Sequence, residues 1–200
     1  MIASLYINWD LWAIATMLIS IYWFDRKKFV PSAVFMALSI STKFLPIFLL
    51  IPIAFILWRD TKIKELLKYI AIVSITWISI NAPFALTTPT GWWRFYKLNM
   101  EREADWGSLW LAFSQLGLGL ANLNYLAILL LLIGLTSFVI FLFEVKNTPT
   151  LASVAFIVVA IVMLASKVYS PQYVLWLTPL AVMAIGGAKD LPAFWIWQGA

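Results

Sequence analysis

The chain has 200 residues, of which 64% are apolar and 12% charged, and its net charge is +5. A soluble domain is about half apolar and a quarter charged, so these few charges cannot cover a soluble surface and the chain is expected to lie in a lipid bilayer. The lack of Cys excludes disulfide and thiolate chemistry, and the lack of His removes the commonest general base and metal ligand.

Apolar segments follow one another along most of the chain. A membrane-spanning helix needs about 20 mostly apolar residues. In chain order this length predicts spans over residues 5–24, 30–58, 69–86, 125–143, 151–166 and 173–188, with a partial span from residue 191. Residues 110–120 are too few to span and predict a re-entrant or interfacial helix. The expected fold class is therefore an all-α, polytopic transmembrane helical bundle with about six to eight membrane segments. We expect residues 1–200 to form a single transmembrane domain and to be an incomplete part of a longer membrane domain.

The apolar segment 30–58 needs a turn within it. Basic clusters lie on both sides of it, at 25–28 and 59–68, and short basic loops stay in the cytoplasm. The segment must leave and return on the same side, although it is too short for two full spans. These conditions predict a short hairpin that turns at 41–46, and a single kinked span is the competing interpretation.

Alternating the spans from these loops places the long loop 87–124 and the turn 167–172 on the outer side of the plasma membrane. Asp10, beside Asn8, lies in the first span near the same surface, and a carboxylate within a membrane segment is a functional-site hypothesis by default. Five basic residues also fall on this side, against the usual bias: Lys43, Arg94, Lys97, Arg102 and Lys167. We expect these groups to gather at one level of the membrane, which gives an active face directed outward. Nucleic acid is not an expected partner, because the other basic residues fall in short loops between spans.

The two charged residues within the apolar segments each have two interpretations. Asp10 is either a helix cap or ion-pair partner, or part of a substrate site. Lys43 either pairs with Asp10 or binds a lipid phosphate.

The polar segments on the outer side are equally open. Aromatic and basic residues alternate over 91–97, which suits an interfacial anchor and also a site that stacks on sugars and grips phosphate. The carboxylates of 101–105 belong to a solvated loop or divide acid and base work between them. Residues 167–173 form a plain turn or one that faces a ligand.

Four motifs occur in order: Asn8-Trp9-Asp10-Leu11, then Ser39 through Pro46, Arg94 through Trp110, and Ser166 through Leu177. In this order they resemble the core of bacterial glycosyltransferase family 87, polyprenyl-phosphate-dependent mannosyltransferase-like proteins of the GT-C superfamily. The resemblance implies a multi-span membrane enzyme that moves a sugar, often mannose, from a polyprenyl-phosphate donor to an acceptor hydroxyl of a glycolipid or glycan. No cofactor or metal is expected, because the chain has no phosphate-binding Gly loop and no HExxH motif.

The expected substrate-binding residues are Asn8, Asp10, Lys43, Arg94, Lys97, Arg102, Lys167, Tyr169 and Gln172. In such enzymes the base is usually a carboxylate in an external loop that precedes the Asn-Trp-Asp segment. Members of the family are longer than this chain, which begins at that segment. No catalytic residue is therefore assigned, Asp10 stays a secondary candidate, and this part alone is expected to be inactive or to belong to a longer enzyme.

Two other functions compete with a glycosyltransferase. A transporter or flippase for a lipid-linked or anionic solute also has buried charges and Pro-broken helices. Transporters usually carry internal repeats, which this sequence lacks, and its unusual charges cluster on one side. A membrane scaffold without catalysis predicts that loss of Lys43 or Arg94 leaves function intact.

Overall fold

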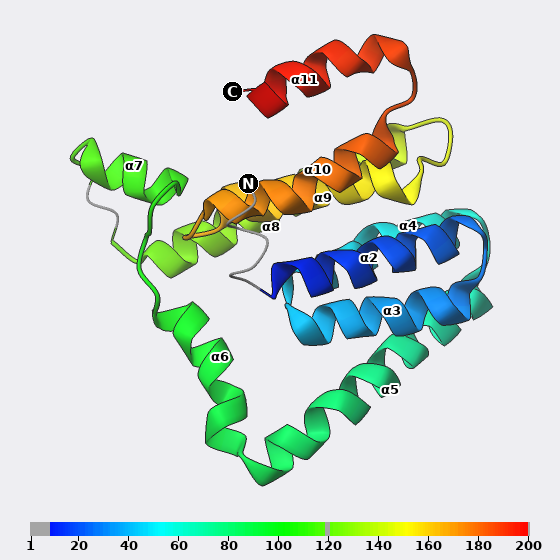
Figure 1. Cartoon of the computed structure of the whole chain (residues 1–200), viewed down its shortest axis with the longest axis horizontal. Coiled ribbons are helices and arrows are strands. Elements are labelled where there is room, and N and C mark those ends of the chain that lie inside the picture. The colour runs from blue at the N-terminus through cyan, green and yellow to red at the C-terminus, as the bar shows by residue number, and fades with distance from the viewer. Residues whose placement is uncertain (1–8, 119–120, 200) are drawn as a thin grey trace.

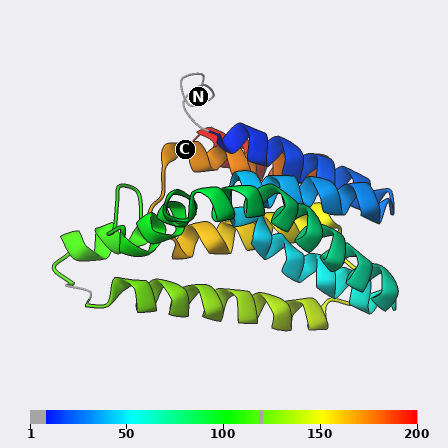
Figure 2. The same cartoon turned by 90° about the horizontal axis from the view of Figure 1, so that it is seen from below.

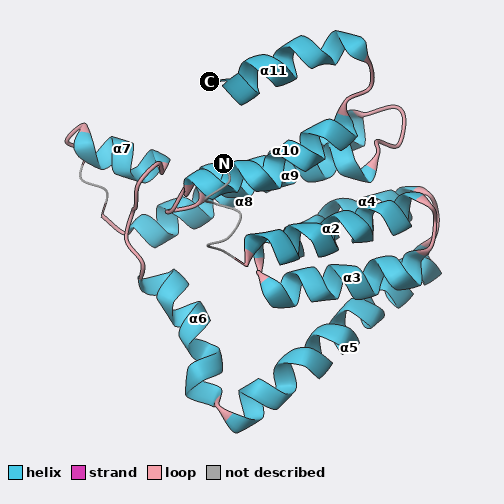
Figure 3. Cartoon of the chain, viewed as in Figure 1, coloured by secondary structure: helices cyan, strands magenta, loops and turns pink. Residues whose placement is uncertain are grey.

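The computed structural model describes residues 9–118 and 121–199, and the elements of this part of the chain are helices joined by loops (Figure 1). It holds ten α-helices and three short 3-10 helices, and none of these residues lies in a strand (Figure 3). The predicted all-α class is confirmed.

Helices α2 (Asp10–Asp25) and α3 (Phe29–Thr42) form an antiparallel pair that packs against α5 (Ile63–Thr87). A buried group of hydroxyls ties the three helices together. The Ser20 hydroxyl donates to the backbone carbonyl of Ser32 over 2.8 Å, and the Tyr69 hydroxyl lies 3.1 Å from that of Ser32. Because a buried hydroxyl without a partner costs free energy, these contacts fix how α2, α3 and α5 align along one another.

The chain reverses direction after α3. Lys43 has an extended backbone that ends the helix, and the 3-10 helix η1 (Leu45–Leu49) then leads into α4 (Leu50–Arg59). Helices α3 and α4 run in opposite directions (Figure 1). The reversal falls within the predicted turn at 41–46, so two helices describe the segment better than one kinked span.

The second half of the chain builds on α9 (Leu151–Ala165), which packs between α8 (Leu123–Glu144) and α10 (Val174–Ala184). Helix α9 also contacts α2, η1 and α4, which joins the two halves. The 3-10 turn η2 (Pro171–Tyr173) precedes α10, and η3 (Ala188–Asp190) leads into α11 (Leu191–Gly199).

Residues 87–124, predicted as a long loop, contain two helices, α6 (Pro89–Glu101) and α7 (Leu109–Gln115). Hydropathy misses α6 because charged and aromatic residues alternate along it, although the Pro at its start is a helix-initiation signal. Helix α7 overlaps the segment 110–120, which was predicted as a re-entrant or interfacial helix. The Ser108 hydroxyl caps α7 by accepting from the backbone N–H of Leu111 over 3.2 Å.

Within the part of the chain that the structure describes, two helices are long and apolar enough to cross a membrane, α5 with 25 residues and α8 with 22. Only 6% of the most apolar stretch of α5 and 11% of that of α8 is buried. Figure 2 shows α8 along one edge of the assembly. Because a large apolar surface left open marks a contact with lipid or protein, these helices indicate association with a membrane.

The other predicted spans form shorter helices. Helix α3 has 14 residues and α9 has 15, which at 1.5 Å per residue give about 21–23 Å, less than the ~30 Å of a hydrocarbon core. Helix α10 ends at Ala184, just before Gly186 and Gly187, which no longer favour a helix. Six to eight membrane segments therefore stay a prediction.

The basic loops meet at one end of the helical assembly. Arg59, the last residue of α4, donates to the carbonyls of Leu142 and Lys146 over 3.2 and 2.7 Å, and also to that of Val145. These carbonyls belong to the C-terminal end of α8 and the loop after it, where helical acceptors have no partner within the helix.

Replacing Arg59 by Met is expected to lower the free energy of unfolding by about 2 kcal/mol, because three carbonyls lose a charged donor. Chemical unfolding in detergent micelles measures the change. The matched control, Lys64→Met on the exposed start of α5, should stay within about 0.5 kcal/mol of the unmodified protein. Equal losses in both variants would contradict this role of Arg59.

Candidate functional site

Asp10, the first residue of α2, and Lys43, which follows α3, form an ion pair. Figure 1 shows that the start of α2 and the end of α3 lie at the end of the assembly opposite the α2–α3 loop. Because α2 and α3 are antiparallel, the first turn of α2 and the residue after α3 come to the same end. The Asp10 side chain is 1% exposed and that of Lys43 is 25% exposed. The Lys43 ammonium also lies 5.5 Å from the ring centroid of Tyr173. Of the two interpretations of Lys43, the structure has pairing with Asp10.

Asp10 does not cap its helix. The capping position belongs to Trp9, and the structure has no side-chain cap there. Oxygen Oδ1 of Asp10 meets Lys43, whereas Oδ2 is buried and has no hydrogen-bond partner among the described residues. A buried carboxylate held by a single partner depends strongly on that partner.

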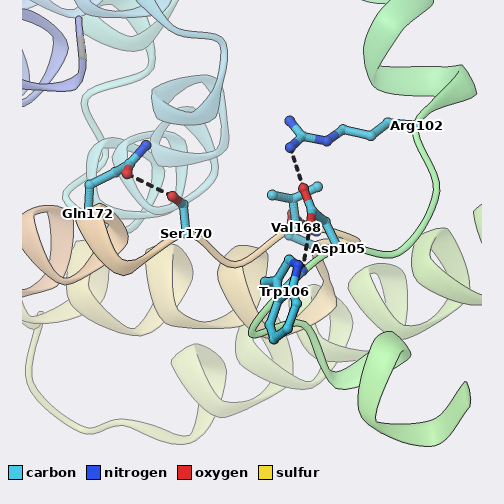
Figure 4. A network of polar contacts seen from close by, with 7 residues as sticks. Arg102, Asp105, Trp106, Val168, Ser170 and Gln172 are labelled. Carbon is cyan, nitrogen blue, oxygen red and sulfur yellow. Dashed lines mark hydrogen bonds and ion pairs between the residues drawn. The ribbon is translucent and has the colours of Figure 1, made fainter. Parts of the chain in front are cut away.

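A second polar cluster joins the end of α6 to the turn between α9 and α10 (Figure 4). Arg102 contacts the Asp105 carboxylate over 2.6 Å. The Lys167 ammonium donates to the carbonyl of Met100 over 3.2 Å, and also to the carbonyl of Arg102 and to Oδ1 of Asn124. Three acceptors therefore face the three protons of Lys167. These hydrogen bonds hold the α6–α7 connection in place.

The pKa values of Asp105 and Lys167 in this cluster are both shifted. The backbone N–H of Trp106, followed by the side chain of Arg102, holds the pKa of Asp105 below its usual value. Burial, followed by the positive charge of Arg102, lowers the pKa of Lys167. Asp105 is thus ionised over the whole physiological range.

The same connection closes tightly on the turn. The backbone N–H of Asp105 donates to the carbonyl of Lys167 over 2.9 Å. Gly107 has a φ of +75°, and a Cβ at this position would lie 2.5 Å from the carbonyl oxygen of Tyr169. Only Gly fits there without strain. The ring of Tyr169 meets that of Tyr173 edge to face at 5.8 Å, which links this cluster to the Asp10–Lys43 pair.

Gln172 also lies in this turn, where its Oε1 accepts from the Ser170 hydroxyl over 2.7 Å (Figure 4). Its position supports the shape of the turn.

A cavity of about 410 Å³ lies between the end of α3, the second half of α5 and α6. Lys43 lies in its wall, next to Ser41. The remaining walls are mainly aromatic and include Trp77, Trp92 and Tyr96. We call this space the aromatic cavity.

Asn81 organises the aromatic cavity and was missed by the sequence analysis. Its amide nitrogen donates to the Ser41 hydroxyl over 3.3 Å and to the Trp77 carbonyl over 3.0 Å. Its oxygen accepts from the indole N–H of Trp92 over 3.1 Å. An amide in the apolar span 69–86 is the signal that was available, because polar groups inside membrane helices are costly.

Arg94 and Lys97 lie on another part of α6. They line a separate groove with Trp93 and Glu101, and Lys97 contacts Glu101 over 3.6 Å in an exposed pair. The structure does not bring them to the Asp10–Lys43 pair, although Gly91 lines both this groove and the aromatic cavity.

One predicted substrate-binding residue, Asn8, lies outside the described residues. Within residues 9–118 and 121–199, no three acidic side chains come close enough together to hold a metal ion.

Comparisons of the chain with protein-family profiles, with curated proteins and with solved structures found no match.

Proposed function

We propose that the chain is part of a membrane glycosyltransferase of the GT-C type. It moves a hexose from a polyprenyl-phosphate donor to an acceptor hydroxyl of a glycolipid or glycan at the outer face of the cell membrane. Mannose is the first candidate for this hexose. The observation that carries the proposal is the Asp10–Lys43 pair beside an aromatic cavity, in an assembly with apolar flanks. The rings of Tyr169 and Tyr173 link this pair to the second polar cluster.

Support for the membrane part comes from exposed apolar residues. Along α8 these include Ile128, Leu129, Leu132, Ile133 and Ile140, each at least half exposed. Exposing such an apolar surface to water costs about 25 cal/mol of free energy per Å², whereas contact with lipid hydrocarbon does not carry this cost. The proposal includes six to eight membrane segments, with the basic loops inside and the polar clusters outside.

The chemistry requires a cation near the leaving group. The acceptor oxygen forms a bond to the anomeric carbon, the bond from this carbon to the phosphate oxygen breaks, and the polyprenyl phosphate leaves with the electron pair. A positive charge stabilises the charge that develops on the phosphate. Among the five cations predicted on the outer side, Arg94 alone makes no ion pair or hydrogen bond within the described residues, so it is the candidate for this role.

The acceptor proton needs a base. Asp10 is buried and bound to Lys43, so it does not reach an acceptor, and we give it a positioning role. The base stays unassigned.

The test uses membranes from cells that produce the full-length gene product, supplied with a polyprenyl-phosphate hexose labelled in the sugar. We expect label to move into a glycolipid or glycan fraction, and not in membranes that lack the protein. If the label crosses the bilayer on an unchanged donor, the protein is a flippase; if no hexose-linked donor gives transfer, the proposal is wrong.

Arg94→Ala is expected to lower the transfer rate about tenfold, because one charge-assisted contact to phosphate is worth about 1.5 kcal/mol. Lys146→Ala, which removes an exposed cation at the opposite end, is the control and should leave the rate unchanged. Equal rates for Arg94→Ala and the unmodified protein would remove Arg94 from the phosphate site.

A further inference from the structure

The aromatic cavity has fixed walls. Asn81 connects three helices. Its side chain forms hydrogen bonds with Ser41 near the C-terminal end of α3, with Trp77 one turn earlier on α5, and with Trp92 on α6. The rings of Trp77 and Trp92 meet at 6.4 Å, and those of Trp92 and Tyr96 at 5.1 Å. Walls held in this way lose little freedom when a ligand enters.

The aromatic cavity is also close to neutral. Among the described residues Lys43 is the one charged residue in its lining, and its charge is balanced by Asp10. A phosphate would find no uncompensated cation here, so the lining favours a ligand without charge.

Hydrogen-bonding capacity remains in the wall. The Ser41 hydroxyl accepts from Asn81 and keeps its own proton to donate, and Oδ1 of Asn81 accepts one bond while it has two lone pairs. A hydrocarbon chain would leave the Ser41 proton without an acceptor, and an unsatisfied buried donor costs about 1–3 kcal/mol.

We infer that the aromatic cavity binds a neutral pyranose ring. A pyranose has a C–H face that packs on aromatic rings and a rim of hydroxyls that needs donors and acceptors. The volume of about 410 Å³ falls in the range of small-molecule sites. Asn81 is six residues from the end of α5, about 9 Å along the helix, so the ring would lie near the membrane surface. That this ring is the sugar acceptor rests on the proposed function; its binding does not.

The test titrates the purified full chain in detergent with methyl α-D-mannopyranoside and methyl α-D-glucopyranoside, by saturation-transfer NMR and without any donor. We expect saturable binding that Asn81→Leu and Trp92→Ala each weaken about tenfold. Trp93→Ala, on the same helix but outside the cavity lining, should change the dissociation constant less than twofold. Trp92→Phe keeps an aromatic ring in the wall and removes the hydrogen bond to Asn81. Weaker binding by this variant would therefore reflect the lost hydrogen bond and not a loss of folding.

The outcomes separate the two proposals. Geraniol, an uncharged isoprenoid alcohol, is the competing probe. Binding of geraniol that Asn81→Leu strengthens, together with no sugar binding, would overturn the pyranose site. Sugar binding without transfer from any donor would keep the site and remove the proposed function. Transfer together with unchanged sugar binding in Asn81→Leu and Trp92→Ala would keep the proposed function and overturn the pyranose site.

Discussion

Replacing Lys43 by Ala is expected to lower the free energy of unfolding by about 3–5 kcal/mol, since it leaves the carboxylate of Asp10 buried without its counter-charge. Asp10 is 1% exposed, and its second oxygen has no partner among the described residues that could compensate. Thermal unfolding in detergent micelles measures the loss.

Two variants sharpen this prediction. The double variant Asp10→Asn with Lys43→Met removes both charges at similar volume, so it should recover most of the lost stability. Lys62→Ala breaks the pair with Asp60, in which both side chains are about one third exposed, and should cost at most about 1 kcal/mol. A loss for Lys43→Ala no larger than that for Lys62→Ala would show that the buried pair does not stabilise this end of the protein.

Replacing Gly107 by Ala is expected to cost about 3 kcal/mol, because it combines two penalties. The left-handed backbone, with φ of +75°, costs a residue with a Cβ about 1–2 kcal/mol. The new Cβ would also lie 2.5 Å from the Tyr169 carbonyl oxygen, so the connection after α6 must move away from the turn.

Gly117 provides the matched control. Its φ is +80°, but a Cβ there would meet nothing within 4 Å. Gly117→Ala should therefore show the backbone penalty alone, about 1–2 kcal/mol. The difference between the two variants in chemical unfolding measures the close approach of Gly107 to Tyr169, and equal costs would contradict that contact.

Sequence reasoning was most successful where a single physical constraint dominates. Lys43 within an apolar segment must snorkel, bind or pair, and the turn at 41–46 brings it to the start of the first helix. Pairing with Asp10 was therefore among the interpretations that the sequence offered, and the structure has it.

Other features depend on partners that leave no mark in the sequence. Lys167 donates mainly to backbone carbonyls, which every residue has. The sequence therefore could not distinguish a structural role of Lys167 from ligand binding. Asn81 acquires its role only when α5 meets α3 and α6. Helix α6 itself lacks the apolar periodicity on which the prediction relied. Hydropathy counts apolar residues and does not show where the backbone leaves the helix. The predicted span 173–188 therefore extends beyond Ala184, where α10 ends, whereas α5 and α8 are longer than the spans predicted over them.

An outward-facing site requires that the two ends of the helical assembly lie on opposite sides of a membrane. Because the chain has no Cys, a single introduced Cys is its only thiol. Glu103→Cys in the α6–α7 connection and Asn147→Cys in the α8–α9 loop both lie at exposed positions. In intact cells a membrane-impermeant maleimide should label Glu103→Cys, and it should reach Asn147→Cys only after lysis. Labelling of both variants from the same side would contradict the outward-facing site.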